Sequence, residues 1–419
     1  MTSTPSRSLL RPGNLRTLFM AQSVSNLGSW IGLIALNVRI YDLTGSSLGV
    51  AGLFLFTAAP SLLFGLVGGV WVDRFARQKV MVVADSLRVA LTLLLLATDN
   101  VTLFYGLVFL NATAGVLYRT AQLAIIPQVV QRPVELPAAN ALINTALMLT
   151  MALGPAVGGL LVSQLGVNAA LGLDALSFGL SALLIARLRL TRTSHPASSR
   201  QTWRNLRAGL ALAAGERPLT LVILTASAVT LGTGAVNALE IVYARTVLGV
   251  GEVGYGLLFS AWGVGLLAGT LSLNAWLRRF PPVHLLTAGV TLLGAAIVAY
   301  ALAPTLPVAV AIGLAGGVGA GLQFSLLHTL LQTHTPSDYL GRVSGLFTAA
   351  RDLTLFVSML AAGALADRVG VPAIFMAAGL VILVAAGLSL EYTLDIIGNG
   401  QGSQDLQERT SSCQSCPNR

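Results

Sequence analysis

Apolar stretches of about 20 residues follow one another along this chain, and only short polar segments separate them. A helix of that length spans the hydrocarbon core of a bilayer. Backbone groups in lipid must be paired within the protein, and the stretches lack the alternation of barrel strands. Only 10% of the 419 residues are charged, far below the roughly 25% of soluble domains. The sequence therefore predicts an all-α, polytopic membrane protein.

Twelve such stretches can be separated, six on each side of a longer polar segment. We predict twelve transmembrane helices at 15–41, 48–72, 80–97, 102–125, 137–162, 169–188, 219–247, 254–276, 283–302, 307–331, 340–366 and 372–390. The predicted domains are a cytoplasmic tail (1–14), a six-helix bundle (15–190), a linker with a short amphipathic segment (191–217), a second six-helix bundle (218–391) and a second cytoplasmic tail (392–419).

Basic residues are distributed unequally between the two sides predicted for the loops. The tails, the linker and the loops on their side hold many arginines, whereas the opposite loops hold only Arg368. Because arginine and lysine concentrate on the cytoplasmic side, both termini are predicted to lie inside a plasma membrane, the inner membrane in a bacterium. The net charge of +9 follows from this topology, so we expect no nucleic-acid partner.

The turn between the second and third predicted helices carries a concentration of charge. Its residues Gly69, Asp73, Arg74, Arg77 and Lys79 include four charges within seven positions. A carboxylate that faces a helix N-terminus stabilises it by about 0.3–1 kcal/mol. Asp73 is therefore predicted to hold the start of the eleventh helix and close the two halves on the cytoplasmic side. D73N should then favour inward-open states. The alternative to this closing role is that the turn is an ordinary charged loop.

Two further patterns indicate paired halves. The fifth span contains Gly154, Pro155, Gly158 and Gly159, in which the glycines allow close helix packing and the proline bends the span. Asp73-Arg74 after the second span is repeated by Asp367-Arg368 after the eleventh. Repeated halves with a site between them are a usual transporter architecture.

These motifs resemble those of the major facilitator superfamily. Residues 69–79 are similar to its loop motif, with Ala76 where glycine is usual, and residues 150–159 are similar to its antiporter motif, with Thr150 replacing the first glycine. Other stretches, at 41–46, 138–142 and 341–344, are similar to the drug and siderophore exporter branch, of the macrolide or enterobactin type. In that branch many members carry an acidic residue where this chain has Ser29.

Ionisable residues inside the spans cost about 2.5–3.5 kcal/mol each and are candidates for function. Glu240 and Asp352 are the predicted coupling acids, since a carboxyl group in an apolar cavity takes up a proton near neutral pH. Arg119 resembles an arginine that the superfamily associates with proton transfer; a structural salt bridge is the alternative. Asp85 and Arg88, three residues apart, are predicted to form a structural pair.

The resemblance also implies that spans one, four, seven and ten line a central cavity. Interhelical hydrogen bonding and packing are the alternative role for polar and aromatic residues on these spans. The predicted substrate contacts are Gln22, Asn26, Trp30, Asn111, Asn237 and Gln323.

No motif of a soluble enzyme is present. The chain lacks a phosphate-binding Gly-Lys-Ser/Thr loop, its histidines lack metal-ligand spacing, and Cys413 and Cys416 form an isolated motif in a polar tail. We predict a monomeric secondary transporter, not an enzyme, without metal or cofactor and driven by the proton gradient. It would export an amphiphilic small molecule, such as a drug or siderophore, in exchange for protons across the lipid bilayer. Metabolite uptake and a non-transporting receptor or scaffold are the alternatives.

Overall fold

The computed structural model describes residues 13–72, 75–130, 135–188, 215–336 and 339–387, and all regular secondary structure in these ranges is helical. Asp73, Arg74, most of the linker, most of the first tail and the whole second tail, including the two cysteines, lie outside the described residues. The predicted all-α fold is therefore confirmed for the part of the chain that the structure describes.

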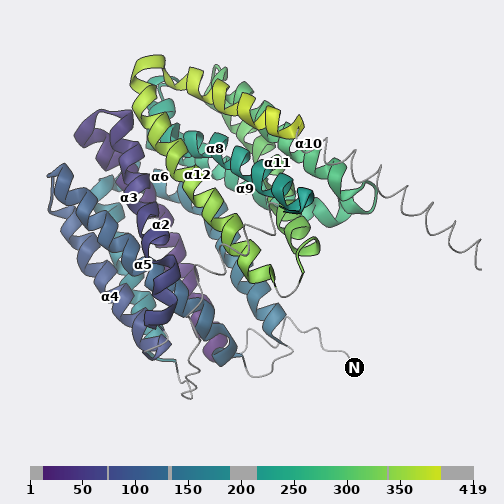
Figure 1. Cartoon of the computed structure of the whole chain (residues 1–419). Helices are drawn as coiled ribbons and strands as arrows, with labels where there is room; N and C mark the ends of the chain where they lie inside the picture. Colours follow the sequence, from purple (N-terminus) through teal and green to yellow (C-terminus); the bar gives the residue numbers. More distant parts are fainter. Residues whose placement is uncertain (1–12, 73–74, 131–134, 189–214, 337–338, 388–419) are drawn as a thin grey trace, which may run out of the picture.

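Two groups of helices lie side by side, the first purple to blue and the second teal to yellow (Figure 1). The first group is α2 (Asn14–Thr44), α3 (Ser47–Val72), α4 (Arg77–Leu96), α5 (Val101–Val129) and α6 (Leu136–Ala186). The second group is α8 (Arg217–Thr246), α9 (Glu252–Leu277), α10 (Pro282–Ala301), α11 (Leu306–Thr333), α12 (Leu340–Val369) and a last helix, Val371–Gly387.

Helix α6 contains an interruption that divides it in two. It has 51 residues, about 76 Å at 1.5 Å per residue, against about 30 Å for the hydrocarbon core of a bilayer. Gly166 is non-helical, with φ 83° and ψ 165°, a conformation that disfavours any residue with a side chain. The loop predicted at 163–168 is thus wrong in extent, because one glycine makes the turn that six residues were expected to make.

Left-handed glycines mark one end of the molecule. Gly45, Gly166, Gly249 and Gly370 all have positive φ, and they occupy the turns that follow α2, the first part of α6, α8 and α12. The turns after α2 and after the first part of α6 correspond to the turns after α8 and α12 in the second half. We call this end the glycine-turn end.

Within each half, a few helices make most of the contacts. In the first half, α6 packs against α2 and α4, while α5 packs against α3 and α4. In the second half, α11 packs against α9 and α10, and α12 packs against α8. Two seams join the halves, α6 with α9 and α3 with α12. The two seams place elements distant in sequence next to one another.

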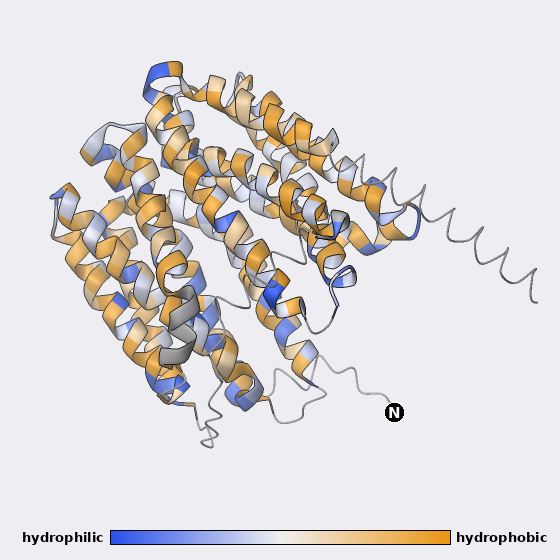
Figure 2. Ribbon diagram, in the orientation of Figure 1, coloured by the Kyte–Doolittle hydropathy of each residue, from blue (hydrophilic) through white to orange (hydrophobic). Residues whose placement is uncertain are grey.

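Nine of the described helices are long and apolar enough to cross a membrane. Helix α4 is not among them because it carries Arg77, Lys79, Asp85 and Arg88, and Val371–Gly387 is shorter. Apolar residues cover the bodies of the helices and hydrophilic residues gather at several ends (Figure 2). Large apolar side chains such as Leu123 and Leu271 are exposed, as expected on a surface that contacts lipid. The chain is a multi-pass membrane protein.

Candidate functional site

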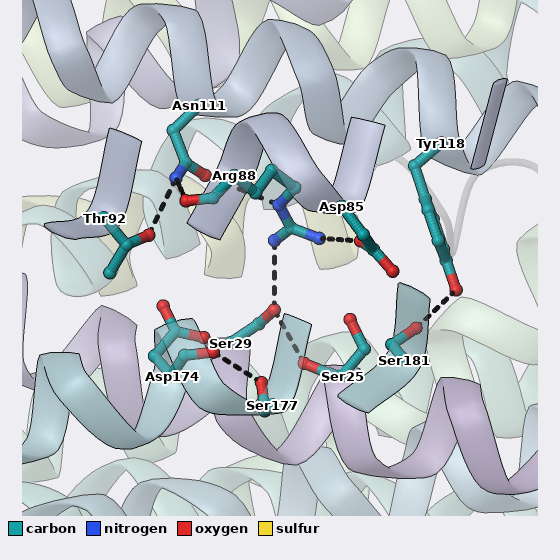
Figure 3. A network of polar contacts seen from close by, with 10 residues as sticks. All are labelled: Ser25, Ser29, Asp85, Arg88, Thr92, Asn111, Tyr118, Asp174, Ser177 and Ser181. Atoms are coloured by element: carbon teal, nitrogen blue, oxygen red, sulfur yellow. Dashed lines mark hydrogen bonds and ion pairs between the residues drawn. The ribbon is translucent and has the colours of Figure 1, made fainter. Parts of the chain in front are cut away.

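A buried polar network occupies the middle of the first half (Figure 3). Asp85 and Arg88 lie on one face of α4, with Asp85 Oδ1 3.6 Å from Arg88 Nη1. The predicted pairing of these two residues is therefore confirmed. The Asp85 side chain is fully buried, whereas that of Arg88 is 14% exposed. The guanidinium lies 3.6 Å from the centre of the Phe178 ring, so an aromatic face holds it from one side.

Arg88 also connects α4 with α2 and α5. Its Nη2 donates to Ser29 Oγ at 3.2 Å, and its Nε donates to Asn111 Oδ1 at 3.5 Å. The Asn111 amide nitrogen donates in turn to Thr92 Oγ1 at 3.1 Å. Asn111 was predicted to contact substrate, but in this structure its amide is engaged in the network.

Asp174, on the second part of α6, places a second carboxylate beside this network (Figure 3). It is 5% exposed, and its Oδ1 has no hydrogen-bond partner among the described residues. Its carboxylate fills space left by Gly32 of α2, where a Cβ would lie 2.3 Å from Asp174 Oδ2. The space at Gly28 is filled mainly by Ser177, with Asp174 Oδ1 3.2 Å from the Cβ position. A carboxylate therefore lies near Ser29 of α2, although it comes from Asp174 on α6.

Asp174 was not among the site residues predicted from the sequence. A signal was available, because Asp174 is an acidic residue within the apolar stretch predicted as the sixth span. Its neighbours in the network come from α2 and α4, far away in the sequence, so its partners could not be read from local spacing.

Glu240 lies in a second buried cluster, within the second half. It is 1% exposed, and its Oε1 accepts a hydrogen bond from the Tyr300 hydroxyl at 3.0 Å. The Tyr243 hydroxyl donates to the Tyr300 carbonyl, and Tyr255 is also fully buried. No cation lies within ion-pair distance of Glu240 in the described residues. The predicted coupling acid is thus enclosed by aromatic side chains.

The other two predicted coupling residues lie apart from this cluster. Asp352 is half-buried on α12, and Arg119 is exposed on α5. Arg351, the neighbour of Asp352, has its guanidinium 5.6 Å from the Phe347 ring and its Nε 3.4 Å from Thr230 Oγ1. Arg351 therefore faces α8, and this contact fits a structural role in helix packing.

The predicted substrate contacts have different surroundings. Gln22 is buried with no partner for its amide among the described residues, and Gln323 is buried. Asn26 and Asn237 are half-buried. The Trp30 ring lies 5.6 Å from that of Phe259, on the opposite half. No hydrogen bond joins any two of the six predicted residues within the described ranges.

The glycines of the fifth-span motif make close contacts with two helices. A Cβ at Gly154 would lie 2.5 Å from Trp30 Cβ, and one at Gly158 3.1 Å from Ile31 Cα, so these two glycines pack on α2. Gly159 faces α9 instead, where a Cβ would lie 2.4 Å from the Glu252 carbonyl oxygen. The motif, including Pro155, thus lies where α6 meets both α2 and the opposite half.

Part of the loop motif can also be placed. Gly69 lies in the last turns of α3. Arg77 Nη1 donates to the Ala124 carbonyl at 3.1 Å, which ties the start of α4 to α5, and Lys79 is exposed. The predicted cytoplasmic contact of Asp73 is not tested, because Asp73 lies outside the described residues.

Polar contacts join the halves at the glycine-turn end. Arg245 of α8 forms ion pairs with Asp42 of α2 and, at 2.8 Å, with Glu252 of α9. Asp367 Oδ1, at the end of α12, accepts a hydrogen bond from the backbone N–H of Ser47, the first residue of α3, at 3.3 Å. The sequence analysis gave no role to Arg245, and it noted Asp367 only as a repeat of Asp73.

Solved structures share this arrangement of helices. A mutant of the nucleoside transporter NupG matches with a TM-score of 0.77 over 90% of this chain and 99% of that one, at 10% identity. A bacterial homologue of the iron transporter ferroportin, in its inward-facing state, matches with a TM-score of 0.70 over 90% and 98%, at 18% identity. The likeness at this identity concerns the fold alone, which the chain shares with these two proteins.

The sequence assigns the family. Residues 4–410 match the family described as transmembrane secretion effector, and the chain belongs to this family of the major facilitator superfamily. The uncharacterized MFS-type transporter YfiS of Bacillus subtilis is 27% identical, over 90% of this chain and 92% of that protein. The multidrug efflux pump Tap of Mycobacterium tuberculosis is 28% identical (88% and 91%), and macrolide efflux protein A of Streptococcus pyogenes is 22% identical (88% and 93%). The predicted superfamily is therefore confirmed.

Proposed function

We propose that the chain exports amphiphilic small molecules, such as drugs, in exchange for protons and by alternating access. Relatives named as multidrug and macrolide efflux pumps support export. The protein would act as a monomer in a plasma membrane, the inner membrane in a bacterium, with the proton gradient in place of a cofactor.

We further propose twelve spans with both termini inside. The eleven described helices, with α6 divided at Gly166, correspond to the twelve predicted stretches. The arginine distribution then assigns the glycine-turn end to the outer face. Contacts between the halves at that end support an inward-open arrangement, with the outer side closed.

One observation supports proton coupling: buried carboxyl groups outnumber buried cations. The carboxyl groups of Asp85, Asp174 and Glu240 are buried. Among the described residues, Arg88 is the only arginine within ion-pair distance of any of these three groups. Charges without a counterion are costly in a bilayer, so such groups favour binding protons. Glu240, Asp352 and Arg119 remain candidates for the coupling group.

The test is dye transport in inverted membrane vesicles that contain the protein. An imposed pH gradient, acid inside, should drive ethidium accumulation, and collapse of the gradient should abolish it. Vesicles without the protein provide the baseline. Accumulation that does not depend on the gradient would reject proton coupling, and no transport across a broad panel of toxins, siderophores and metabolites would favour a receptor or scaffold.

A further inference from the structure

We infer that Asp85, Asp174 and Arg88 form the binding site for the exchanged proton. This inference rests on the proposed export function and deepens it by locating the coupling site. The first half encloses two carboxylates and one guanidinium, so the ionised network has one uncompensated negative charge. Binding of a single proton to either carboxylate makes the network neutral.

The groups around this site come from four helices. Helix α2 contributes the hydroxyls of Ser25 and Ser29 (Figure 3). Helix α5 contributes Asn111 and Tyr118, whose hydroxyl lies 3.5 Å from Ser181 Oγ on α6. The remaining charged group nearby, Arg119, is exposed and lies outside the buried network. The charge count of the buried network thus depends on Asp85, Asp174 and Arg88.

Arg88 gives this site a partly exposed side chain, which the Glu240 cluster lacks. The Arg88 side chain is 14% exposed and reaches Ser29 and Asn111, both half-buried, on two other helices. Glu240 lies behind Tyr300, Tyr243 and Tyr255, each of them fully buried. Arg88 therefore links the buried Asp85 to the partly exposed side of this site, and the Glu240 cluster has no such link.

The exchange step is a proton transfer without any other reactant. On the outer side, a proton from water forms an O–H bond with one carboxylate, and Arg88 then neutralises the other. On the inner side, that O–H bond breaks and the proton returns to water. The vacated carboxylate shares Arg88 again, and the network recovers its negative charge. For this cycle to drive export, the two facing states must differ in their affinity for the proton.

The test compares carboxylate variants in the inverted-vesicle assay with ethidium. D174N and D85N each leave one carboxylate opposite one guanidinium, so neither needs a proton for neutrality. Both should still bind ethidium and equilibrate it across the membrane, but lose accumulation driven by the pH gradient. In detergent, ethidium should release protons from the wild type and not from either variant. D174E keeps the carboxyl group and should restore coupling, and D99N, at an exposed ion pair with Arg39, is the matched control.

The outcomes separate this inference from the proposed function. Absence of gradient-driven accumulation in the wild type would reject the proposed function itself. If the wild type, D174N and D85N all accumulate ethidium in response to the pH gradient, the proposed site is wrong. Loss of this accumulation in E240Q alone would also overturn the site. If D174N does not fold, D85N and the proton release of the wild type decide: a folded, coupled D85N or a wild type without proton release overturns the site.

Discussion

At the scale of single residues, the position of Asp174 depends on the absence of a side chain at Gly32. A methyl group there would lie 2.3 Å from Asp174 Oδ2, too close for both to keep their places. We expect G32A to displace the carboxylate, to destabilise the protein by about 1–3 kcal/mol and to reduce gradient-driven export. Thermal unfolding in detergent and ethidium transport measure the two effects.

Gly115 of α5 offers a matched control, since a Cβ there meets no atom within 4 Å. G115A should leave both stability and transport close to the wild type. Equal behaviour of G32A and G115A would show that the close contact at Gly32 does not position Asp174.

Residue-scale chemistry could be predicted from the sequence where it depends on local spacing. Asp85 and Arg88 are three residues apart on a helix, and their pairing followed directly. The third member, Asp174, belongs to another helix, and only the tertiary packing of α6 against α2 and α4 brings it close. Isolated polar residues such as Asn111 were assigned to a cavity, because a sequence does not distinguish a side chain facing a cavity from one bonded to its neighbour.

At the scale of helices, the seam between α6 and α9 relies on backbone contact. A Cβ at Gly256 would lie 2.4 Å from the Pro155 carbonyl oxygen, and backbone atoms cannot move without separating the helices. Ala156 N–H donates to Ser260 Oγ across the same seam at 2.8 Å. We expect G256A to separate the two helices and to increase amide hydrogen exchange around Ala156.

Gly172, on the second part of α6, is the control for this change because it has no atom within 4 Å of a Cβ. G172A should leave exchange around Ala156 unaltered. Protection that persists in G256A would mean that the seam tolerates the methyl group.

The motif at 154–159 was recognised from sequence, but its division between two neighbours, α2 and α9, depends on how the halves meet.

At the scale of the whole molecule, the two seams close at the glycine-turn end. Gly363-x-x-x-Asp367-Arg368 at the end of α12 repeats Gly69-x-x-x-Asp73-Arg74 at the end of α3. A Cβ at Gly363 would lie 2.3 Å from Ala51 Cβ, and Asp367 accepts from the N-terminus of α3. Asp367 thus makes a contact of the kind predicted for Asp73, a carboxylate at a helix N-terminus of the other half, while the contact of Asp73 itself stays a prediction.

This arrangement predicts that removing polar contacts at the glycine-turn end shifts the protein toward outward-open states. A carboxylate at a helix N-terminus contributes about 0.3–1 kcal/mol, and a partly exposed ion pair contributes about as much. The combined change R245Q and D367N should therefore increase the outward-open population several-fold.

S260C, in a background with Cys413 and Cys416 replaced by serine, reports this shift, because Ser260 is buried in the α6–α9 seam. An impermeant maleimide added to intact cells should label S260C faster in the double variant. R39Q breaks an exposed ion pair at the same end but within one half, and it should leave labelling unchanged. Equal labelling in R245Q/D367N and R39Q would contradict a role for these contacts in closing the outer side.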